Sequence, residues 1–583
     1  MKKRTLLTKL LSAALVAGLV FSAPNTALAS VKTFPDVTQK MTSSLYWYKD
    51  IKDASKVLAT EAQIKKLNKA IIAADGTNVT DLKKVSSTVD GKALNEALAA
   101  STKADIEYFG EKKYDVNGDQ VTASYYNSML TNTQSKDTST HPVSYGIAVN
   151  RTVLRCFPTD KAILDDPGDN DFDNLYVTAL RVNEPVVIQS VSADQKFYYA
   201  KSSCYTGWAP VEDIAVCSDR ETWLDAWDHS GKELLVICGS KVRTEASNTD
   251  PDTADRLLTM GTTLEIVDKS DYPKLISNRT PYNNYVVYLP VRRADGSFDK
   301  QPALISQHYN VHEGYLPLTQ KNVTDILFEK LGDTYGWGGM LESQDCSGYI
   351  RDVYSCFGLN LSRNTTWQTA SPVKKYSLAG LSSEAKKQII KNLPVGSSLF
   401  FPGHEMAYLG HVKDKYYVIS SASSIMNPKK DGERQRTRCV AINTLDIKRA
   451  NGNTWLESLT YATIPFAGTT NSLYNKSFVG KGFAKALDTT QLNKLSSKGK
   501  KLTVNWGATD ETSAIEGYQI QYTSGDDFST AKTIKVKKKE RSYCTISGFT
   551  RGDTIKVRIR NYLTIDGKKY YSKWSKTKTH ILR

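Results

Sequence analysis

The spacing of apolar residues divides the chain into segments of different structure. Residues 54–73 carry apolar side chains at helical spacing, which predicts an amphipathic helix: Leu58, Ile64, Leu67, Ile71 and Ile72. Farther along, the pattern changes to short alternating stretches, such as 186–188 and 197–199, that are separated by turn residues. We therefore expect a helical N-terminal segment at 30–140, followed by a small β-barrel at 141–217.

A second unit with the same alternating pattern covers 218–319 and predicts another barrel, with strands at 234–237, 263–267 and 285–288. Residues 320–467 change to a helical pattern followed by strands, as in an α+β domain. A polar joint at 468–487 predicts a linker. The last segment, 488–583, predicts a β-sandwich from its alternating stretches at 502–506, 518–522, 534–536 and 555–559.

The first 29 residues have the features of a secretory signal. A basic start is followed by an apolar run at 10–21 and then by the small residues of Ala27-Leu28-Ala29. The run is about a dozen residues long, whereas a membrane-spanning helix needs roughly 20. We expect cleavage before Ser30 and an exported mature protein without a membrane span.

Charge is concentrated at the two ends of the chain. The 583 residues carry a formal net charge of +16, and the segment 488–583 alone holds 20 basic against 9 acidic residues. The signal segment adds four basic residues, so everything between is nearly neutral. A nucleic-acid enzyme is disfavoured, because the positive charge lies on a terminal module rather than along a large groove.

Eight cysteines are scattered singly, without the paired spacing of zinc or redox motifs. We expect most of them to be small buried apolar residues. The sequence also lacks a phosphate-binding glycine loop and a dinucleotide fingerprint. It therefore predicts neither a cofactor nor a metal.

Cys346 is the candidate nucleophile. It precedes Ile350, Val353, Tyr354 and Phe357, whose spacing predicts one apolar helix face. The thiol then lies at the helix N-terminus, where free backbone N–H groups and the helix dipole lower a cysteine pKa. A buried structural cysteine is the alternative, and position alone leaves both readings open.

His404 is the candidate base. Residues 398–401 read as a strand, and period-two alternation places His404, Met406 and Tyr408 on one face of the next strand. If Tyr408 pairs with Tyr416, His404 lies opposite Ser420, which could then orient the imidazole. His411 falls in the predicted turn at 410–415, where a solvated histidine is expected.

Three motifs in order carry a family resemblance. The sequences YGWGG at 335–339, DCSG at 345–348 and FFPGHEMAYLG at 400–410 resemble the NlpC/P60 family of papain-like cell-wall peptidases. The resemblance covers about 320–467. The two barrels, with an acidic loop at 169–173, resemble the bacterial SH3 modules that precede this peptidase in γ-D-glutamyl-L-diamino acid endopeptidases.

The resemblance implies hydrolysis of the bond between γ-D-glutamate and a diamino acid in peptidoglycan stem peptides. Cys346 would attack the carbonyl, and His404 would return the proton to the leaving amine. The Cys346 backbone N–H and the Tyr335 hydroxyl are implied oxyanion donors. Asp345, Ser347 and Trp337 would line the substrate side.

The sequence departs from the family at two places. Ser420 stands where His, Asn or Gln is usual, and a hydroxyl is a shorter orienter of the imidazole. The run Arg363-Asn364-Thr365 stands where relatives that trim free muropeptides resemble Arg-Asp-Ser. In those relatives the acid helps to hold the ammonium of a free N-terminal L-Ala, and Asn364 has no charge to do so. Specificity for free muropeptides is therefore in doubt, and intact cross-linked wall remains a possible substrate.

The last module resembles fibronectin type III, although Ile555 stands where the corner tyrosine of that sandwich is expected. Its positive charge could attract anionic wall polymers, or it could belong to a solvated spacer. Two further alternatives stay open for the whole chain. One is a non-catalytic wall-binding or adhesion protein, and the other is an amidase or transpeptidase on the same Cys/His site.

Overall fold

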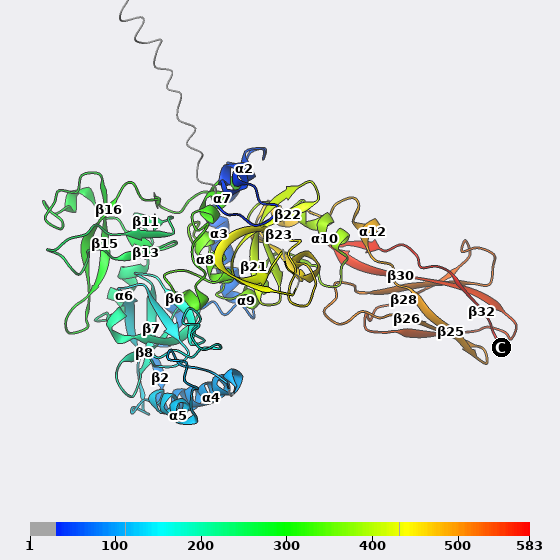
Figure 1. The fold of residues 1–583 in the computed structure, drawn as a ribbon, viewed down its shortest axis with the longest axis horizontal. Coiled ribbons are helices and arrows are strands. Elements are labelled where there is room, and N and C mark those ends of the chain that lie inside the picture. The colour runs from blue at the N-terminus through cyan, green and yellow to red at the C-terminus, as the bar shows by residue number, and fades with distance from the viewer. Residues whose placement is uncertain (1–30, 111, 429, 431) are drawn as a thin grey trace, which may run out of the picture.

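The computed structural model describes residues 31–583 except 111, 429 and 431. The predicted signal segment, 1–29, lies outside the described residues. The α+β domain occupies the middle of the molecule, with the barrel units on one side and the C-terminal sandwich on the other (Figure 1). Within the described residues, no helix is both long enough and apolar enough to cross a membrane.

The N-terminal segment is helical but begins its first long helix later than predicted. Helix α3 starts at Glu61, because the Thr60 hydroxyl caps it and accepts from the Gln63 N–H at 3.3 Å. The preceding residues form strand β1 and pair with β18 instead. The elements are η1 (Gln39–Thr42), α2 (Ser44–Tyr48), β1 (Val57–Ala59), α3 (Glu61–Ala73), η2 (Leu82–Lys84), β2 (Thr88–Asp90), α4 (Gly91–Phe109), α5 (Ala123–Asn132) and β3 (Thr140–Pro142).

The first barrel unit is one continuous antiparallel sheet of order β10-β4-β7-β8-β9-β5-β6. The strands predicted at 186–188 and 197–199 are confirmed within β7 and β8. The elements are β4 (Ser144–Ala148), β5 (Thr152–Arg155), β6 (Tyr176–Leu180), β7 (Pro185–Val191), β8 (Phe197–Lys201), β9 (Thr206–Pro210), η3 (Val211–Asp213) and β10 (Ile214–Val216).

The second unit consists of one three-stranded sheet, β14-β11-β17, and two strand pairs, β12-β13 and β15-β16. Its buried core includes Leu235, Ile237, Leu264 and Val287. The elements are α6 (Arg220–Trp227), β11 (Leu234–Ile237), β12 (Lys241–Arg243), β13 (Leu257–Thr259), β14 (Thr263–Glu265), η4 (Lys269–Asp271), β15 (Asn284–Arg292), β16 (Phe298–Ser306), β17 (Val311–Glu313) and β18 (Leu318–Thr319).

The α+β domain packs helices on a six-stranded sheet of order β19-β24-β20-β21-β22-β23. Its hydrophobic core also takes in Trp47 and Leu67 from the N-terminal segment. The elements are α7 (Gln320–Phe328), η5 (Trp337–Gly339), α8 (Cys346–Ser355), α9 (Thr365–Thr369), β19 (Val373–Ser377), α10 (Ser383–Ile390), β20 (Ser398–Phe401), β21 (His404–Val412), β22 (Lys415–Met426), β23 (Arg434–Thr444), α11 (Trp455–Ser458) and β24 (Tyr461–Gly468).

The C-terminal segment is a two-sheet sandwich, β25-β26-β29 against β28-β27-β30-β31, with β32 beside β30. Trp506 and Tyr518 lie in its core. The Lys374 ammonium of the α+β domain pairs with Asp566, which ties the sandwich to that domain. The elements are η6 (Ser472–Asn475), α12 (Phe483–Ala486), β25 (Leu492–Lys498), β26 (Lys501–Trp506), β27 (Gly517–Thr523), β28 (Lys532–Val536), β29 (Tyr543–Ser547), β30 (Thr554–Ile565), β31 (Lys568–Tyr571) and β32 (Lys578–Ile581).

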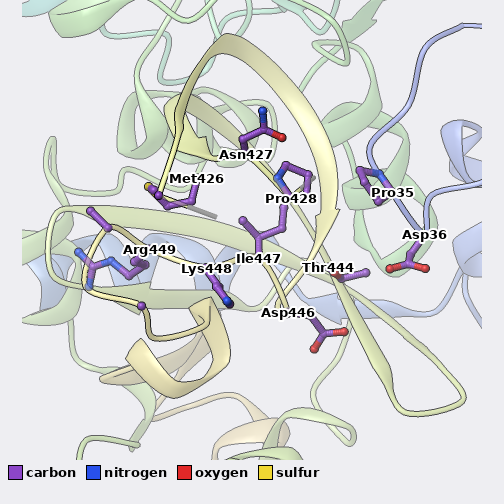
Figure 2. Close-up of a pocket in the computed structure, with 13 residues that line it drawn as sticks. Pro35, Asp36, Met426, Asn427, Pro428, Thr444, Asp446, Ile447, Lys448 and Arg449 are labelled. Carbon is purple, nitrogen blue, oxygen red and sulfur yellow. The ribbon is translucent and has the colours of Figure 1, made fainter. Parts of the chain in front are cut away.

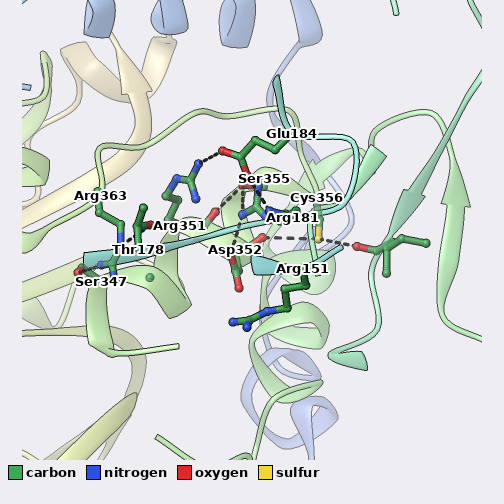
Figure 3. Close-up of polar contacts among 12 residues, drawn as sticks. Arg151, Thr178, Arg181, Glu184, Ser347, Arg351, Asp352, Ser355, Cys356 and Arg363 are labelled. Carbon is green, nitrogen blue, oxygen red and sulfur yellow. Dashed lines mark hydrogen bonds and ion pairs between the residues drawn. The ribbon is translucent and has the colours of Figure 1, made fainter. Parts of the chain in front are cut away.

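Helix α8 is buried along its entire length, not on one face only. Its polar side toward the first barrel unit is satisfied by ion pairs (Figure 3). The guanidinium of Arg181 pairs with Asp352 at 2.6 Å, and that of Arg351 pairs with Glu184 at 3.4 Å. Because charged groups this deeply buried need partners, the barrel holds the helix in one position.

We predict that Arg181→Met lowers the free energy of unfolding by roughly 3–5 kcal/mol, because Asp352 loses its closest cation in a buried site. The measurement is urea denaturation followed by tryptophan fluorescence. Arg293→Met is the matched control, since Arg293 pairs with Asp299 at the surface and its loss costs about 1 kcal/mol or less. Equal effects of the two variants would contradict the prediction.

Candidate active site

Cys346 is the first residue of α8, which confirms its predicted place at a helix N-terminus. Asp345 caps the helix, and its carboxylate accepts from the Gly348 N–H at 3.0 Å. The side chain of Cys346 is nearly covered, with 9% of the residue exposed. The backbone N–H of Glu405, in strand β21, lies against the thiol. The helix start and the β20–β21 hairpin therefore meet at the sulfur.

Asp345 is fixed by a second set of contacts. Its two carboxylate oxygens receive both amino groups of Arg363, at 3.0 and 2.6 Å, and this guanidinium lowers the pKa of the carboxyl despite its burial. Arg363 also donates to the Thr178 hydroxyl of the first barrel unit at 2.8 Å. Both residues are almost fully buried. The contacts of Asp345 and Arg363 hold the start of α8 and thereby position Cys346. A direct contact of either residue with a substrate stays a prediction.

His404 begins strand β21, and its Nε2 lies 3.1 Å from the Ser420 hydroxyl. The predicted contact is confirmed, but the predicted register is wrong. Tyr408 pairs with Val418 instead of Tyr416, because the chain turns later than predicted, at 413–414, with Val412 paired to Lys415; a bulge between Tyr408 and Gly410 offsets part of this shift. Ser420 therefore reaches the imidazole diagonally across the strand pair.

The predicted turn at 410–415 is also shorter in the structure. Strand β21 continues through Val412 and β22 resumes at Lys415. His411 consequently lies in the strand, where its exposed ring stacks on Tyr416 with centroids 5.4 Å apart. His411 stays solvated, as expected, although not in a turn.

Two aromatic rings enclose the His404 imidazole. The ring of Phe401 lies 5.3 Å and that of Trp455 5.1 Å from it, centroid to centroid. Burial, and then the positive charge of Arg449, lower the pKa of His404 to about 4. The imidazole is therefore neutral at ordinary pH.

The pKa of Cys346 differs from the expectation. Burial and the charge of Asp345 raise it to about 12, whereas the helix N-terminus alone predicts a lowered value. Burial also raises the pKa of the neighbouring Glu405 well above its usual range. The resting site therefore holds a neutral thiol at the start of α8 and a neutral imidazole on His404, the residue before the Glu405 whose backbone N–H contacts the thiol.

The first barrel unit forms one edge of the site. Phe172, in the acidic loop, stacks on Trp337 with centroids 4.8 Å apart. Asp169 pairs with Arg438 of β23. Gly338 approaches the barrel so closely that an added Cβ would lie 2.4 Å from the Tyr176 carbonyl oxygen. This edge is thus fixed by stacking, charge and backbone contact.

The remaining predicted residues lie around the same helix start. Tyr335 is buried near the thiol, and burial together with the charge of Asp345 raises the pKa of its hydroxyl. The Ser347 hydroxyl contacts Asp345 at 3.3 Å. Asn364 caps α9 by accepting from the Trp367 N–H, and Thr365 is the first residue of that helix.

Among the described residues, no group of three or more His, Cys, Asp or Glu side chains could hold a metal ion. Six of the eight cysteines are buried, as expected, and Cys156 and Cys439 are half-buried. The acidic loop uses its carboxylates for protein contacts, with Asp169 and Asp171 facing Arg438 and Asp173 pairing with Arg155.

The geometry agrees with comparisons to known families. Residues 332–463 match the NlpC/P60 family, whose members are cysteine peptidases. The chain carries an NlpC/P60 domain. Residues 163–210 match the SH3 domain of the SH3b1 type. Both matches fall inside the α+β domain and the first barrel unit that were predicted from the sequence.

One of the solved structures compared with this chain supports the fold. An NlpC/P60 endopeptidase from Photobacterium damselae subsp. piscicida superposes with a TM-score of 0.58 at 19% identity, covering 75% of this chain and 99% of that chain. The fn3 domain of human contactin 1 covers 16% of this chain and 77% of its own at 12% identity, but with a TM-score of 0.14. No curated protein matches the chain.

Three parts of the site were not found from the sequence. Glu405, Arg449 and Trp455 contact the thiol or the imidazole surroundings, yet only Glu405 lies in a motif. Arg449 and Trp455 come from a loop and a short helix that follow β23. Their placement depends on the sheet order β24-β20-β21, which no local pattern encodes.

We predict that alkylation of Cys346 by iodoacetamide is slow near neutral pH and rises about tenfold per pH unit up to pH 10 without a plateau. The reason is that only the thiolate reacts, and the pKa of the thiol lies at about 12. Peptide mass spectrometry measures the modified fraction, and Cys346→Ala reports the background from the other cysteines. A plateau by pH 8 would show a thiolate already formed in the resting enzyme.

Proposed function

We propose that this protein is a cell-wall cysteine endopeptidase that cleaves the γ-D-glutamyl–diamino acid bond of peptidoglycan stem peptides. The main support is the meeting of Cys346, at the start of α8, with the β21 strand that carries His404. This arrangement lies within the residues that match the NlpC/P60 family.

The neutral resting pair defines the order of proton movements. In this mechanism the neutral imidazole carries its proton on Nε2, which lies 3.1 Å from the Ser420 hydroxyl. Nδ1 is then free to take the proton of the Cys346 thiol as the sulfur attacks the carbonyl carbon. The imidazolium then gives this proton to the leaving amine, and a thioester remains on Cys346. Water attacks the thioester with His404 as base, releases the γ-D-glutamyl acid and restores the thiol.

The oxyanion that forms during attack needs hydrogen-bond donors. The Cys346 backbone N–H belongs to the first helical residue, which has no partner within its own helix. The buried Tyr335 hydroxyl, whose raised pKa keeps it protonated, supplies a second donor. We assign both as oxyanion donors and keep Trp337, with its stack on Phe172, as a wall of the substrate groove.

The other modules support action at a cell wall. We propose that 1–29 is a cleaved secretory signal, that 218–319 is a second SH3-like unit and that 488–583 is a fibronectin type III module. The two sheets of the last segment and its buried Trp506 support that assignment. Its exposed Lys537 and Lys538 would hold the enzyme on anionic wall polymers.

The decisive experiment compares the mature protein with Cys346→Ala on stem peptides and on whole sacculi. We predict a γ-D-glutamyl–diamino acid cut by the wild type alone, identified by mass spectrometry of the products. Products of a different bond would favour an amidase. Equal products from both proteins would remove Cys346 from the mechanism, and no cut from either would favour a binding protein.

A second prediction concerns the orienting hydroxyl. Ser420→Ala should lower kcat by about tenfold with little change in KM, because the imidazole loses its only side-chain hydrogen bond among the described residues. Ser420→Asn restores an acceptor and should recover part of the rate. Steady-state kinetics on one stem peptide measures both. An unchanged kcat in Ser420→Ala would show that packing alone orients His404.

A further inference from the structure

The pocket of about 540 Å³ between the N-terminal segment and the stretch after β23 mixes charges of both signs (Figure 2). Its lining includes Asp36, Asp446, Lys448 and Arg449. Such a mixture does not select one class of ligand. The C-terminal sandwich differs, because it holds 20 basic against 9 acidic residues and gathers arginines on one of its faces.

Five side chains of the C-terminal sandwich form an alternating ladder of aromatic rings and guanidiniums. The Arg558 guanidinium lies over the rings of Phe528 and Trp574, with its carbon 4.0 and 4.6 Å from their centroids. The Arg560 guanidinium lies over Trp574 and Tyr571, at 4.2 Å from each. All five residues are half-buried, so the ladder reaches solvent. Both arginines thus share the indole as a cation–π partner.

Strand β30 places the cations of this face in a row. Lys556, Arg558 and Arg560 alternate with residues whose side chains lie in the sandwich core: Ile555, Val557 and Ile559. The row therefore lies on the outer face, with a spacing of about 7 Å between successive cations. Lys535 of β28 extends this face, since it lies across Gln519 from Arg560.

Hydrogen bonds to amides hold the two arginines. The side-chain oxygen of Gln521 accepts from Arg558 at 2.9 and 2.6 Å, and that of Gln519 accepts from Arg560 at 2.7 Å. Within the described part of the chain, neither guanidinium pairs with a carboxylate, and each keeps terminal N–H groups without a partner. Partial burial lowers the pKa of both arginines, so a bound anion would stabilise their charge.

The loop that carries Trp574 is fixed to β30. The Ser575 hydroxyl accepts from the Ile559 N–H at 3.0 Å. The Ser572 hydroxyl accepts from the Asn561 N–H at 3.2 Å. These bonds hold the indole against both guanidiniums. The cations are therefore ordered before a partner arrives, which lowers the entropic cost of binding.

We infer that this face binds a linear phosphodiester polymer of the cell wall, with successive phosphates on Arg558 and Arg560. The inference rests on the wall association in the proposed function and names its contact site. A guanidinium presents paired N–H groups that fit phosphate oxygens. Successive phosphates joined by a glycerol unit lie about as far apart as alternate residues of a strand, so one polymer contacts both arginines.

A nucleic acid fits this face less well, although it also carries phosphodiesters. Proteins that bind single strands stack the bases on open aromatic faces. Each ring of the ladder already has a guanidinium over it. The ladder therefore favours a polymer without bases.

The test measures binding of the mature protein to labelled poly(glycerol phosphate) by fluorescence anisotropy at several salt concentrations. We expect the double variant Arg558→Gln/Arg560→Gln to bind about tenfold more weakly and to lower the slope of log K against log salt by about one, because two phosphates are no longer neutralised. Trp574→Ala keeps both charges and should weaken binding by about threefold at an unchanged slope.

Arg541→Gln is the matched control. Arg541 lies over the Tyr543 ring and donates to the Tyr543 carbonyl oxygen, but it belongs to the other sheet of the sandwich. Its loss removes the same charge from the same module and should change the affinity by less than about twofold. If Arg541→Gln weakens binding as much as Arg560→Gln does, net charge explains the binding and the ladder assignment is wrong.

Three further results would contradict the assignment. One is wild-type affinity in Arg558→Lys/Arg560→Lys, which keeps the charge but not the planar donors. The others are tighter binding to poly-L-glutamate or to a single-stranded oligonucleotide with the same number of charges. Binding is measured without a cleavable peptide, so its failure leaves the peptidase assignment standing. Circular dichroism of each variant confirms that a weaker affinity does not come from loss of the fold.

Discussion

The burial of helix α8 on all sides is the constraint on which the site depends. A helix that carries Arg351 and Asp352 cannot be enclosed unless each charge meets an opposite charge. The first barrel unit supplies Arg181 and Glu184, and the loop before α9 supplies Arg363 to the capping Asp345. The barrel therefore contributes to the structure of the α+β domain. The ion pairs fix helix α8 and its capping residue, and they thereby fix the position of the Cys346 sulfur.

The same enclosure explains the electrostatic state of the site. Removing water from a thiol and an imidazole favours the uncharged form of each, and the nearby Asp345 carboxylate and Arg449 guanidinium act in the same direction. The helix dipole is outweighed by these effects. A site of this kind is protected from stray reaction at the thiol until a substrate replaces the missing polar surroundings.

The sequence predicted most of the elements and the central pair of residues, and its errors have physical causes. The motif around Cys346 and the strand that begins at His404 depend on local spacing, so both were found. The register of the β21–β22 hairpin was missed because the run of turn residues at 410–415 does not show that the chain turns only at 413–414. The raised thiol pKa was missed because burial is a property of the assembled domains. Arg449 and Trp455 reach His404 through sheet order alone, which a single sequence does not display.

The pairing of β1 with β18 has a consequence for how the molecule is made. Val57 meets Thr319 only after both barrel units have been synthesised, so the nascent chain must hold an unsatisfied strand for most of that time. Trp47 and Leu67 are likewise synthesised long before the residues of the α+β domain whose core covers them. The N-terminal segment is therefore completed only after residue 319 has been made, and the core that covers it only after the whole α+β domain has emerged.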